Sequence, residues 1–330
     1  MNRAGPAYFS REEGVCGQSF QKDLVKTTEH RVFAELFERR NPIAPDQDMS
    51  ERAIAHHVGQ IASMVARGEP IAFVLPAFPG KSPNRRKTLS HLPDLAERLA
   101  LQELSQMCEA IGGIHAPGAV VHVCSDGYVF SDLVHIPDAH VCEYTDELES
   151  WSGELYPGRF AYFDLKDAYP AQPDLDRMRE MLTEEYGDPV EALSAEVKAD
   201  PAANAMYRGI TRFLYEDYKG MSAFAELSNT AIQKKARATA YRVIQRSNAW
   251  SALLAKRYPR AVRLSIHPQG PDSTKFGIKL VPCLDIWRTP WHSVAVKRDG
   301  QVYLERRADV EAGACRLMFR NGRPCHFIDF

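Results

Sequence analysis

Residues 71–75 and 119–124 of this 330-residue chain read IAFVL and AVVHVC, and these two short apolar runs decide the fold. The first run is followed by PAFPGKSPNRRKTLS (76–90) and the second by SDG (125–127). Short runs rich in β-branched residues and bounded by turn-forming residues are typical of buried strands. The sequence therefore predicts two buried strands, each ending in a polar loop.

Helical patterns alternate with these strands. Ser50 is a good N-cap, and apolar residues follow at helical spacing up to Gly68, namely Ile54, Val58, Ile61 and Val65. A second helix is expected from about Pro93 to Gly112. Strands that alternate with helices predict an α/β protein with a largely parallel sheet covered on both faces.

The remaining chain divides by pattern. Residues 1–45 are expected to form an N-terminal extension with one helix, Phe20 to Arg39, ahead of a single domain at 46–330. A third strand is expected at Arg159–Leu165, and residues 173–258 are mainly helical in pattern, as an insertion would be. The last part is rich in strand patterns, at 261–267, 274–281, 291–297, 302–306, 315–319 and 324–328. The hairpin signals Asp299-Gly300 and Asn321-Gly322 predict antiparallel strands that extend the sheet.

Composition excludes several classes of protein. The 41 Lys and Arg residues against 43 Asp and Glu give a formal charge of −2, which disfavours binding to nucleic acid or to an anionic membrane. No apolar stretch is long enough to span a bilayer, and the first residues lack the apolar core of a secretory signal. The seven cysteines are scattered without a Cys-x-x-Cys pair, which argues against a disulfide framework and a zinc site. We expect a cytoplasmic protein with reduced thiols and no metal.

The loop after the first strand is the first candidate site. It carries four cations together with polar side chains, in the sequence Gly80-Lys81-Ser82-Pro83-Asn84-Arg85-Arg86-Lys87. Ligands of parallel sheets bind at the carboxyl ends of the strands, and Lys, Arg, Ser and Asn suit a phosphate group. A solvated basic loop is the alternative. The segment is not a nucleotide P-loop, because position 75 is leucine where that motif needs glycine.

Asp126 is the second candidate. A carboxylate that follows a buried strand is well placed to act as a general acid or base. The alternative is an Asp-Gly turn in which the side chain satisfies its own backbone. Proximity to the basic loop favours the catalytic role.

The strand predicted at residues 261–267 supplies a third set. Arg263, Ser265 and His267 alternate along it and share one face, which fits either a pocket wall or a solvent-facing edge. Lys275 and Lys279 share a face of the next predicted strand, where either could bind an anion or, if desolvated, act as a base. Exposure to solvent is the more common situation of a lysine.

Trp291 and His292 form the last candidate. They fit a pocket for an aromatic group, or alternatively a core tryptophan beside a buried histidine. The chain contains eleven histidines, yet none stands in a His-Glu-x-x-His pattern or another usable set of metal ligands.

Five segments in this order resemble the pyoverdine/dityrosine biosynthesis family, whose bacterial members include isonitrile synthases. The segments are IAFVLPAFPGKSPNRRK, HVCSDGYVFSD, RLSIHPQG, TKFGIKLVP and TPWHSVAV, and the similarity covers residues from about 50 to about 300. The resemblance implies a Rossmann-like fold and a synthase without a cofactor. Its substrates would be L-tyrosine or L-tryptophan and ribulose 5-phosphate. The amine would condense with the sugar ketone, phosphate would leave, and carbon–carbon cleavage would leave one sugar carbon on nitrogen.

The resemblance also gives the candidate residues roles. Phosphate would be held by Lys81, Ser82, Asn84, Arg85 and Lys87. Proton transfers would fall to Asp126, His267 and Lys275. Trp291 and His292 would line the amino acid side, with Arg263 or Lys279 at its carboxylate. Alanine at Lys81 or Asp126 is expected to abolish turnover and leave folding largely intact.

Other functions remain open at this point. An iron/2-oxoglutarate oxygenase would be the usual companion of a bacterial synthase in a paerucumarin-type pathway, whereas the fungal branch of the family forms N-formyltyrosine. A phosphate-binding regulatory protein could use the same loop without turnover. A kinase or ligase that uses ATP is disfavoured by the incomplete P-loop. The sequence does not choose between tyrosine and tryptophan.

Overall fold

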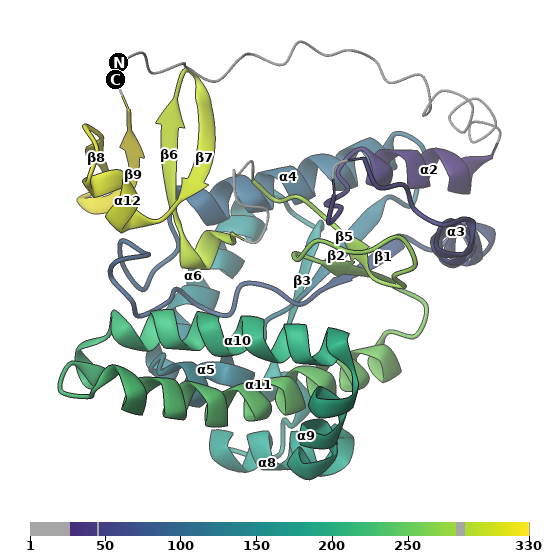
Figure 1. Ribbon diagram of the computed structural model, residues 1–330. Helices are drawn as coiled ribbons and strands as arrows, with labels where there is room; N and C mark the ends of the chain where they lie inside the picture. The colour runs from purple at the N-terminus through teal and green to yellow at the C-terminus, as the bar shows by residue number, and fades with distance from the viewer. Residues whose placement is uncertain (1–26, 45, 282–287, 330) are drawn as a thin grey trace.

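The structure is a computed structural model that describes residues 27–44, 46–281 and 288–329 (Figure 1). It contains two sheets, one of five strands and one of four, with helices around them. The helices are α2 (Thr28–Phe37), α3 (Glu51–Ala66), α4 (Leu95–Gly112), α5 (Gly127–Val134), α6 (Asp138–Leu155), α7 (Leu165–Ala168), α8 (Leu175–Tyr186), α9 (Val190–Ala199), α10 (Pro201–Lys219), α11 (Asn229–Arg257) and α12 (Arg307–Glu311), with the short 3-10 helices η1 (Ser222–Phe224) and η2 (Pro290–His292).

The larger sheet confirms the predicted α/β fold. Its strands are β1 (Ile71–Leu75), β2 (Ala119–Cys124), β3 (Phe160–Phe163), β4 (Val262–Ser265) and β5 (Phe276–Gly277). All neighbours pair in parallel, in the order β3-β2-β1-β4-β5. Leu75 of β1 lies beside Val123 of β2, and Val74 lies beside Arg263 of β4. The carboxyl ends of these three strands are therefore adjacent.

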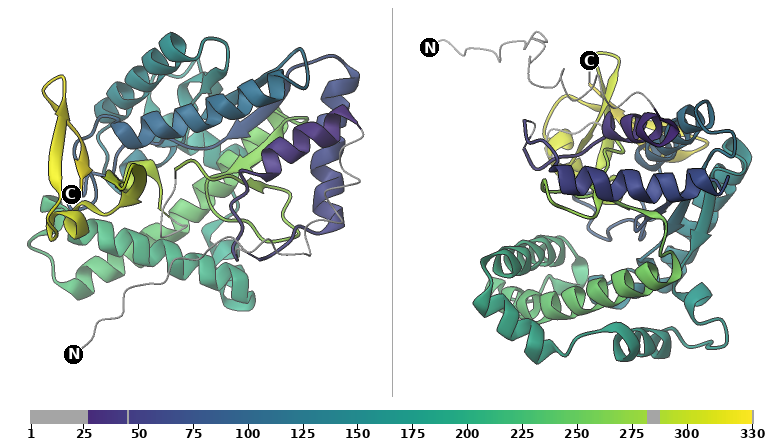
Figure 2. Two further views of the ribbon diagram at one scale, coloured as in Figure 1. Left: turned by 90° about the horizontal axis from the view of Figure 1, so that it is seen from above. Right: turned by 90° about the vertical axis from the view of Figure 1, so that its right-hand side faces the viewer.

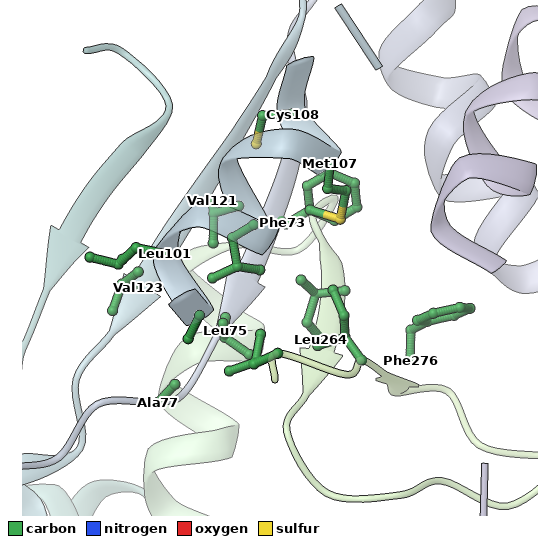
Figure 3. Packing of buried hydrophobic residues seen from close by; sticks show 14 of the residues in the cluster. Phe73, Leu75, Ala77, Leu101, Met107, Cys108, Val121, Val123, Leu264 and Phe276 are labelled. Carbon is green, nitrogen blue, oxygen red and sulfur yellow. The ribbon is translucent and has the colours of Figure 1, made fainter. Parts of the chain in front are cut away.

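Both faces of this sheet are buried. Phe73 of β1 packs with Leu101 of α4 in the core shown in Figure 3. Its neighbour Val74 points to the opposite face and packs in a second core with Trp250 of α11. Burial on both faces explains why the strand sequences are continuously apolar instead of alternating.

Helices α8 to α11 gather on one side of the molecule (Figure 2) and account for the helical pattern at residues 173–258. The 29-residue helix α11 contributes buried side chains to two hydrophobic cores. Ile232, in its first half, packs with α10 in a separate cluster, whereas Trp250, in its second half, packs against the sheet. The long helix therefore anchors this group of helices to the sheet.

The C-terminal strands form their own sheet. The predicted hairpins exist, β6 (Val294–Arg298) with β7 (Gln301–Glu305) and β8 (Arg316–Arg320) with β9 (Arg323–Ile328). Asp299-Gly300 and Asn321-Gly322 have the positive φ values that such two-residue turns require. The expectation that these strands extend the main sheet is wrong, because they form a second sheet in the order β7-β6-β9-β8. Strands β6 and β9 are parallel and contact α4.

Three local expectations change. Within the predicted extension, α2 packs into the main core through Val32, Phe33 and Leu36, while residues 20–26 of the predicted helix lie outside the described residues. The division of the chain at residue 45 stays a prediction.

Helices α5 and α6 replace the turn expected after β2, and the strand expected at 274–281 is reduced to β5.

Candidate functional site

The strand order brings two of the predicted polar loops to the same edge of the sheet. In the order β3-β2-β1-β4-β5 the chain direction across the sheet reverses at β1 and β4, and ligands of such sheets bind outside the carboxyl ends at this point. The loop after β1 meets the start of α5 closely. A Cβ atom on Gly127 would lie 2.4 Å from the carbonyl oxygen of Pro79, so only glycine allows this approach.

Asp126 stands at the N-cap position of α5, but its side chain makes no capping bond. Burial raises the pKa of its carboxyl group from 3.8 to about 6, while the backbone and the positive charge of Arg263 act in the opposite direction. Its Oδ1 atom is buried without a hydrogen-bond partner in the described part of the chain. Asp126 is therefore a desolvated carboxylate with one unused acceptor.

Arg263 lies on β4, near enough to Asp126 for each charge to affect the other group. Burial lowers the pKa of its guanidinium to about 10, against the opposing effect of Asp126. Its Nη1 atom is also buried and has no hydrogen-bond partner among the described residues. A buried donor without a partner costs about 1–3 kcal/mol, so a ligand that pairs with it gains that free energy.

Two further predicted groups are electrostatically linked to Arg263. Burial and the charge of Arg263 lower the pKa of Lys275, and burial and the charge of Lys275 lower the pKa of His267. Both side chains still reach solvent. Both side chains are therefore accessible to a ligand.

His292 joins the same set from η2. Burial lowers its pKa well below the ordinary value, and the positive charges of Lys87, His267 and Lys81 add to that effect. Its Nδ1 atom lies 3.0 Å from the hydroxyl oxygen of Thr289, and its ring meets Phe213 edge-on. We name Asp126, Arg263, His267, Lys275 and His292 the strand-end cluster.

Lys81 corrects the phosphate-loop hypothesis. Its side chain is fully buried, and its Nζ atom lies 2.8 Å from Asp94 and 2.9 Å from Glu97 and donates to the carbonyl of Pro290 at 3.0 Å. Burial alone would lower the pKa of Lys81, but the two carboxylates outweigh it and raise the pKa. The ammonium therefore links this loop to α4 and η2, instead of facing a phosphate.

Three more residues of the loop point inward. Ser82 donates to Asp217 at 3.3 Å, and Lys87 forms an ion pair with the same carboxylate. The amide of Asn84 donates to the carbonyl of Glu216, so this part of the loop is fastened to α10. Only Arg85, among the five residues predicted to bind phosphate, is exposed and outside these contacts.

Two of the predicted substrate residues are not members of the strand-end cluster, although Trp291 adjoins His292. Trp291 is 3% exposed and packs against Phe78 with ring centroids 5.4 Å apart, which fits the alternative of a core tryptophan. Lys279 is exposed, and its backbone amide pairs with the carbonyl of Arg39 at the margin of the sheet.

Sequence reasoning missed three histidines. His91, His135 and His140 line a cavity together with Arg85. His91 follows the basic loop directly, and the other two flank Ile136-Pro137. The available signal was therefore a histidine close to each loop, but the sequence did not show that the loops meet.

Neither a metal site nor a membrane span emerges from the described residues. They contain no group of three or more His, Cys, Asp or Glu side chains arranged to hold a metal ion. No helix within the described ranges is both long and apolar enough to cross a bilayer.

A parallel sheet whose strand order reverses between β1 and β4 defines a doubly wound α/β protein, a class in which ligands bind at the strand ends. Residues 61–318 match the family model described as "Pyoverdine/dityrosine biosynthesis protein", and the chain belongs to this family.

Individual relatives agree with this assignment. The chain is 45% identical to the L-tyrosine isonitrile synthase of Pseudomonas aeruginosa, across 90% of this chain and 93% of that protein. It is 38% identical to the L-tryptophan isonitrile synthase AmbI2 of Fischerella ambigua, across 92% and 94% of the two chains. The structure superposes on the crystal structure of PvcA from Pseudomonas aeruginosa with a TM-score of 0.85 and a sequence identity of 43%. The match covers 92% of this chain and 100% of the PvcA chain. The similarity thus extends over nearly the whole chain.

Proposed function

We propose that this chain is an isonitrile synthase that converts the amino group of L-tyrosine to an isonitrile, with ribulose 5-phosphate as the carbon donor. The similarity to an L-tyrosine isonitrile synthase over 90% of the chain supports the reaction class. The proposed reaction needs no cofactor. The product would pass to an iron/2-oxoglutarate oxygenase in a paerucumarin- or pyoverdine-type pathway.

One observation carries the amino acid part of the proposal. Arg263 has a buried donor and Asp126 has a buried acceptor close by, and neither atom has a hydrogen-bond partner among the residues that the structure describes. An α-amino acid carries a carboxylate and an amine on one carbon atom, so a single ligand can satisfy both groups. The carboxylate would accept from Arg263, and the amine would donate to Asp126.

The electrostatics of the strand-end cluster fit the proton transfers of imine formation. The amine must lose a proton before it attacks the sugar ketone. Asp126, with a pKa raised to about 6, is mostly ionised at neutral pH and is a stronger base than an ordinary carboxylate. His267 and His292 have lowered pKa values and are neutral at that pH, so each could accept a proton in a later step. Lys275, whose pKa is also lowered, is a further candidate for proton transfer.

Two finer points belong to the same proposal. L-Tryptophan is the second candidate substrate, because AmbI2, at 38% identity, is named for that amino acid. The cytoplasm is the proposed location. All five cysteines that the structure describes are unpaired, which is the state that a reducing compartment maintains.

The test is a direct assay. Purified protein is incubated with ribulose 5-phosphate and either L-tyrosine or L-tryptophan, and the product is trapped with a reagent specific for isonitriles. We expect an isonitrile from L-tyrosine, loss of product in D126N, and slower product formation in R263Q at low concentrations of L-tyrosine. If the folded protein forms no isonitrile from either amino acid, the proposal fails. An N-formyl product would instead assign the chain to the other branch of the family, and phosphate binding without turnover would favour a regulatory protein.

A further inference from the structure

A recess lies outside the strand-end cluster, beside the loop after β1. Its volume is about 210 Å³. Its walls come from this loop, from the turn between α5 and α6, and from residues 221–223 beside η1. The polar lining consists of Lys81, Arg85, His91, His135, His140 and Ser222.

The lining of this recess is basic and contains no acidic residue. Five of its eleven lining residues are Lys, Arg or His, and none is Asp or Glu. Lys81 is already neutralised by Asp94 and Glu97, but Arg85 has no ion-pair partner in the described ranges of the chain. Outside the lining, Glu143 lies 2.7 Å from Nε2 of His91. Arg85 is thus the lining cation whose charge is left for a ligand.

The basic side chains are also crowded. The rings of His91 and His140 stack with centroids 4.1 Å apart. Burial lowers the pKa of His140, and the charges of His91 and Arg85 outweigh the opposite effect of Glu143. Burial and the charge of Arg307 lower the pKa of Arg85. A bound anion would relieve this repulsion.

Size restricts the anion. A cavity of about 210 Å³ is smaller than the ~300–1,000 Å³ that drug-sized ligands occupy, but it is far larger than the ~10–15 Å³ that one water molecule needs. A phosphate group fits between these limits. Pro137, the N-cap of the 18-residue helix α6, also lines the recess, so the positive end of that helix dipole adds to the field.

We propose that this recess, through Arg85, His91 and His140, binds the phosphate group of a phosphorylated small molecule. The identity of that molecule rests on the proposed function, which makes it ribulose 5-phosphate. The loop then has two separate tasks. Its inward cations, Lys81 and Lys87, fix the shape of the loop, and Arg85 alone offers its charge to the ligand.

The experiment compares four full-length proteins: wild type, R85Q, H140Q and the control R86Q. Arg86 is the adjacent exposed cation and does not line the recess. Calorimetry first measures the dissociation constant for inorganic phosphate. We expect R85Q to weaken phosphate binding about 10- to 100-fold and H140Q to weaken it less, because a hydrogen bond from the always-charged guanidinium is the strongest in the set. R86Q should bind phosphate like the wild type.

Steady-state kinetics then identify the ligand. In R85Q the KM for ribulose 5-phosphate should rise by a factor similar to the loss of phosphate affinity, with the KM for the amino acid unchanged. Unaltered phosphate binding in R85Q, or an equal loss in R86Q, would overturn the recess as a phosphate site. Weaker phosphate binding with an unchanged KM would overturn its assignment to the substrate. If the wild type forms no isonitrile but its phosphate binding depends on Arg85, the proposed function fails and the phosphate site stands.

Discussion

Replacement of Asp126 by asparagine is expected to remove activity and to raise stability. The folded protein raises the pKa of this carboxyl group from 3.8 to about 6, so folding is opposed whenever the group is charged. A raised folded-state pKa means that the folded state binds more protons than the unfolded state. The contribution of Asp126 to stability is therefore greatest below pH 3.8 and is lost as the pH rises through about 6.

Linkage gives the magnitude. With pKa values of 3.8 unfolded and about 6 folded, the charged form of Asp126 lowers the free energy of unfolding by about 1 kcal/mol at pH 4.5 and by about 3 kcal/mol at pH 7.5. D126N has no such charge. The difference in the free energy of unfolding between D126N and wild type should thus increase by about 2 kcal/mol in favour of the variant over this range.

Urea denaturation of both proteins at pH 4.5, 5.5 and 7.5 measures this difference. All other titrating groups are common to the two proteins, so their effects largely cancel. D146N, which removes an exposed carboxylate from α6, serves as the matched control and should differ little from wild type at any of these pH values. If the difference between D126N and wild type is independent of pH, or if D126N is less stable at pH 7.5, the description of Asp126 as a desolvated carboxylate is wrong.

Four other predictions concern the same region. In the wild type, kcat/KM should fall as the pH drops through about 6, because protonated Asp126 cannot accept a proton from the amine. A pH profile without this fall would exclude Asp126 as the base. R263Q should raise the KM for tyrosine at least about tenfold and change the KM for ribulose 5-phosphate little, and equal changes in both would refute contact with the amino acid carboxylate. K81M should lower the free energy of unfolding by about 3–5 kcal/mol, because it leaves two buried carboxylates unpaired, and an unchanged urea midpoint would contradict that role. W291A should lower the free energy of unfolding by about 3–5 kcal/mol, because it removes a buried side chain from the core. W291F should keep the KM for tyrosine within about twofold, and a larger rise would show that Trp291 contacts the substrate after all.

The order of strands and helices could be predicted from local patterns, since each pattern reports on burial. The apolar runs at β1 and β2 and the Asp-Gly and Asn-Gly turns contain all the information that their conformations need. The start of α5 is different. Ser125-Asp126-Gly127 has the composition of a turn, and the glycine is required by contact with Pro79, a residue 48 positions away along the chain. Local sequence does not contain that contact.

The candidate site shows the same limit. Asp126 and His267 could be placed together because each follows a parallel strand and the carboxyl ends of these strands meet at one edge, whereas Arg263 lies within β4 and Lys275 precedes β5. The role of Lys81 could not be predicted, because its charge is balanced by Asp94 and Glu97 on the next helix. A cluster of cations indicates an anion site only if the fold supplies no carboxylates of its own. Arg85 differs from Lys81 and Lys87 in this respect, and only the three-dimensional structure shows it.

We expect the pairing of β9 with β6 to limit how early the protein acquires its active form during synthesis. Strand β9 lies between β6 and β8 in the smaller sheet, so that sheet is completed only after residue 328 has left the ribosome. Strand β6 begins two residues after His292, and η2 holds the loop after β1 through the pairing of Ser82 with Trp291. A nascent chain that has finished the larger sheet therefore still lacks the support for one side of its site. Turnover is expected to begin only after the last strand is in place, and ribosome-bound chains that stop before β9 should be inactive.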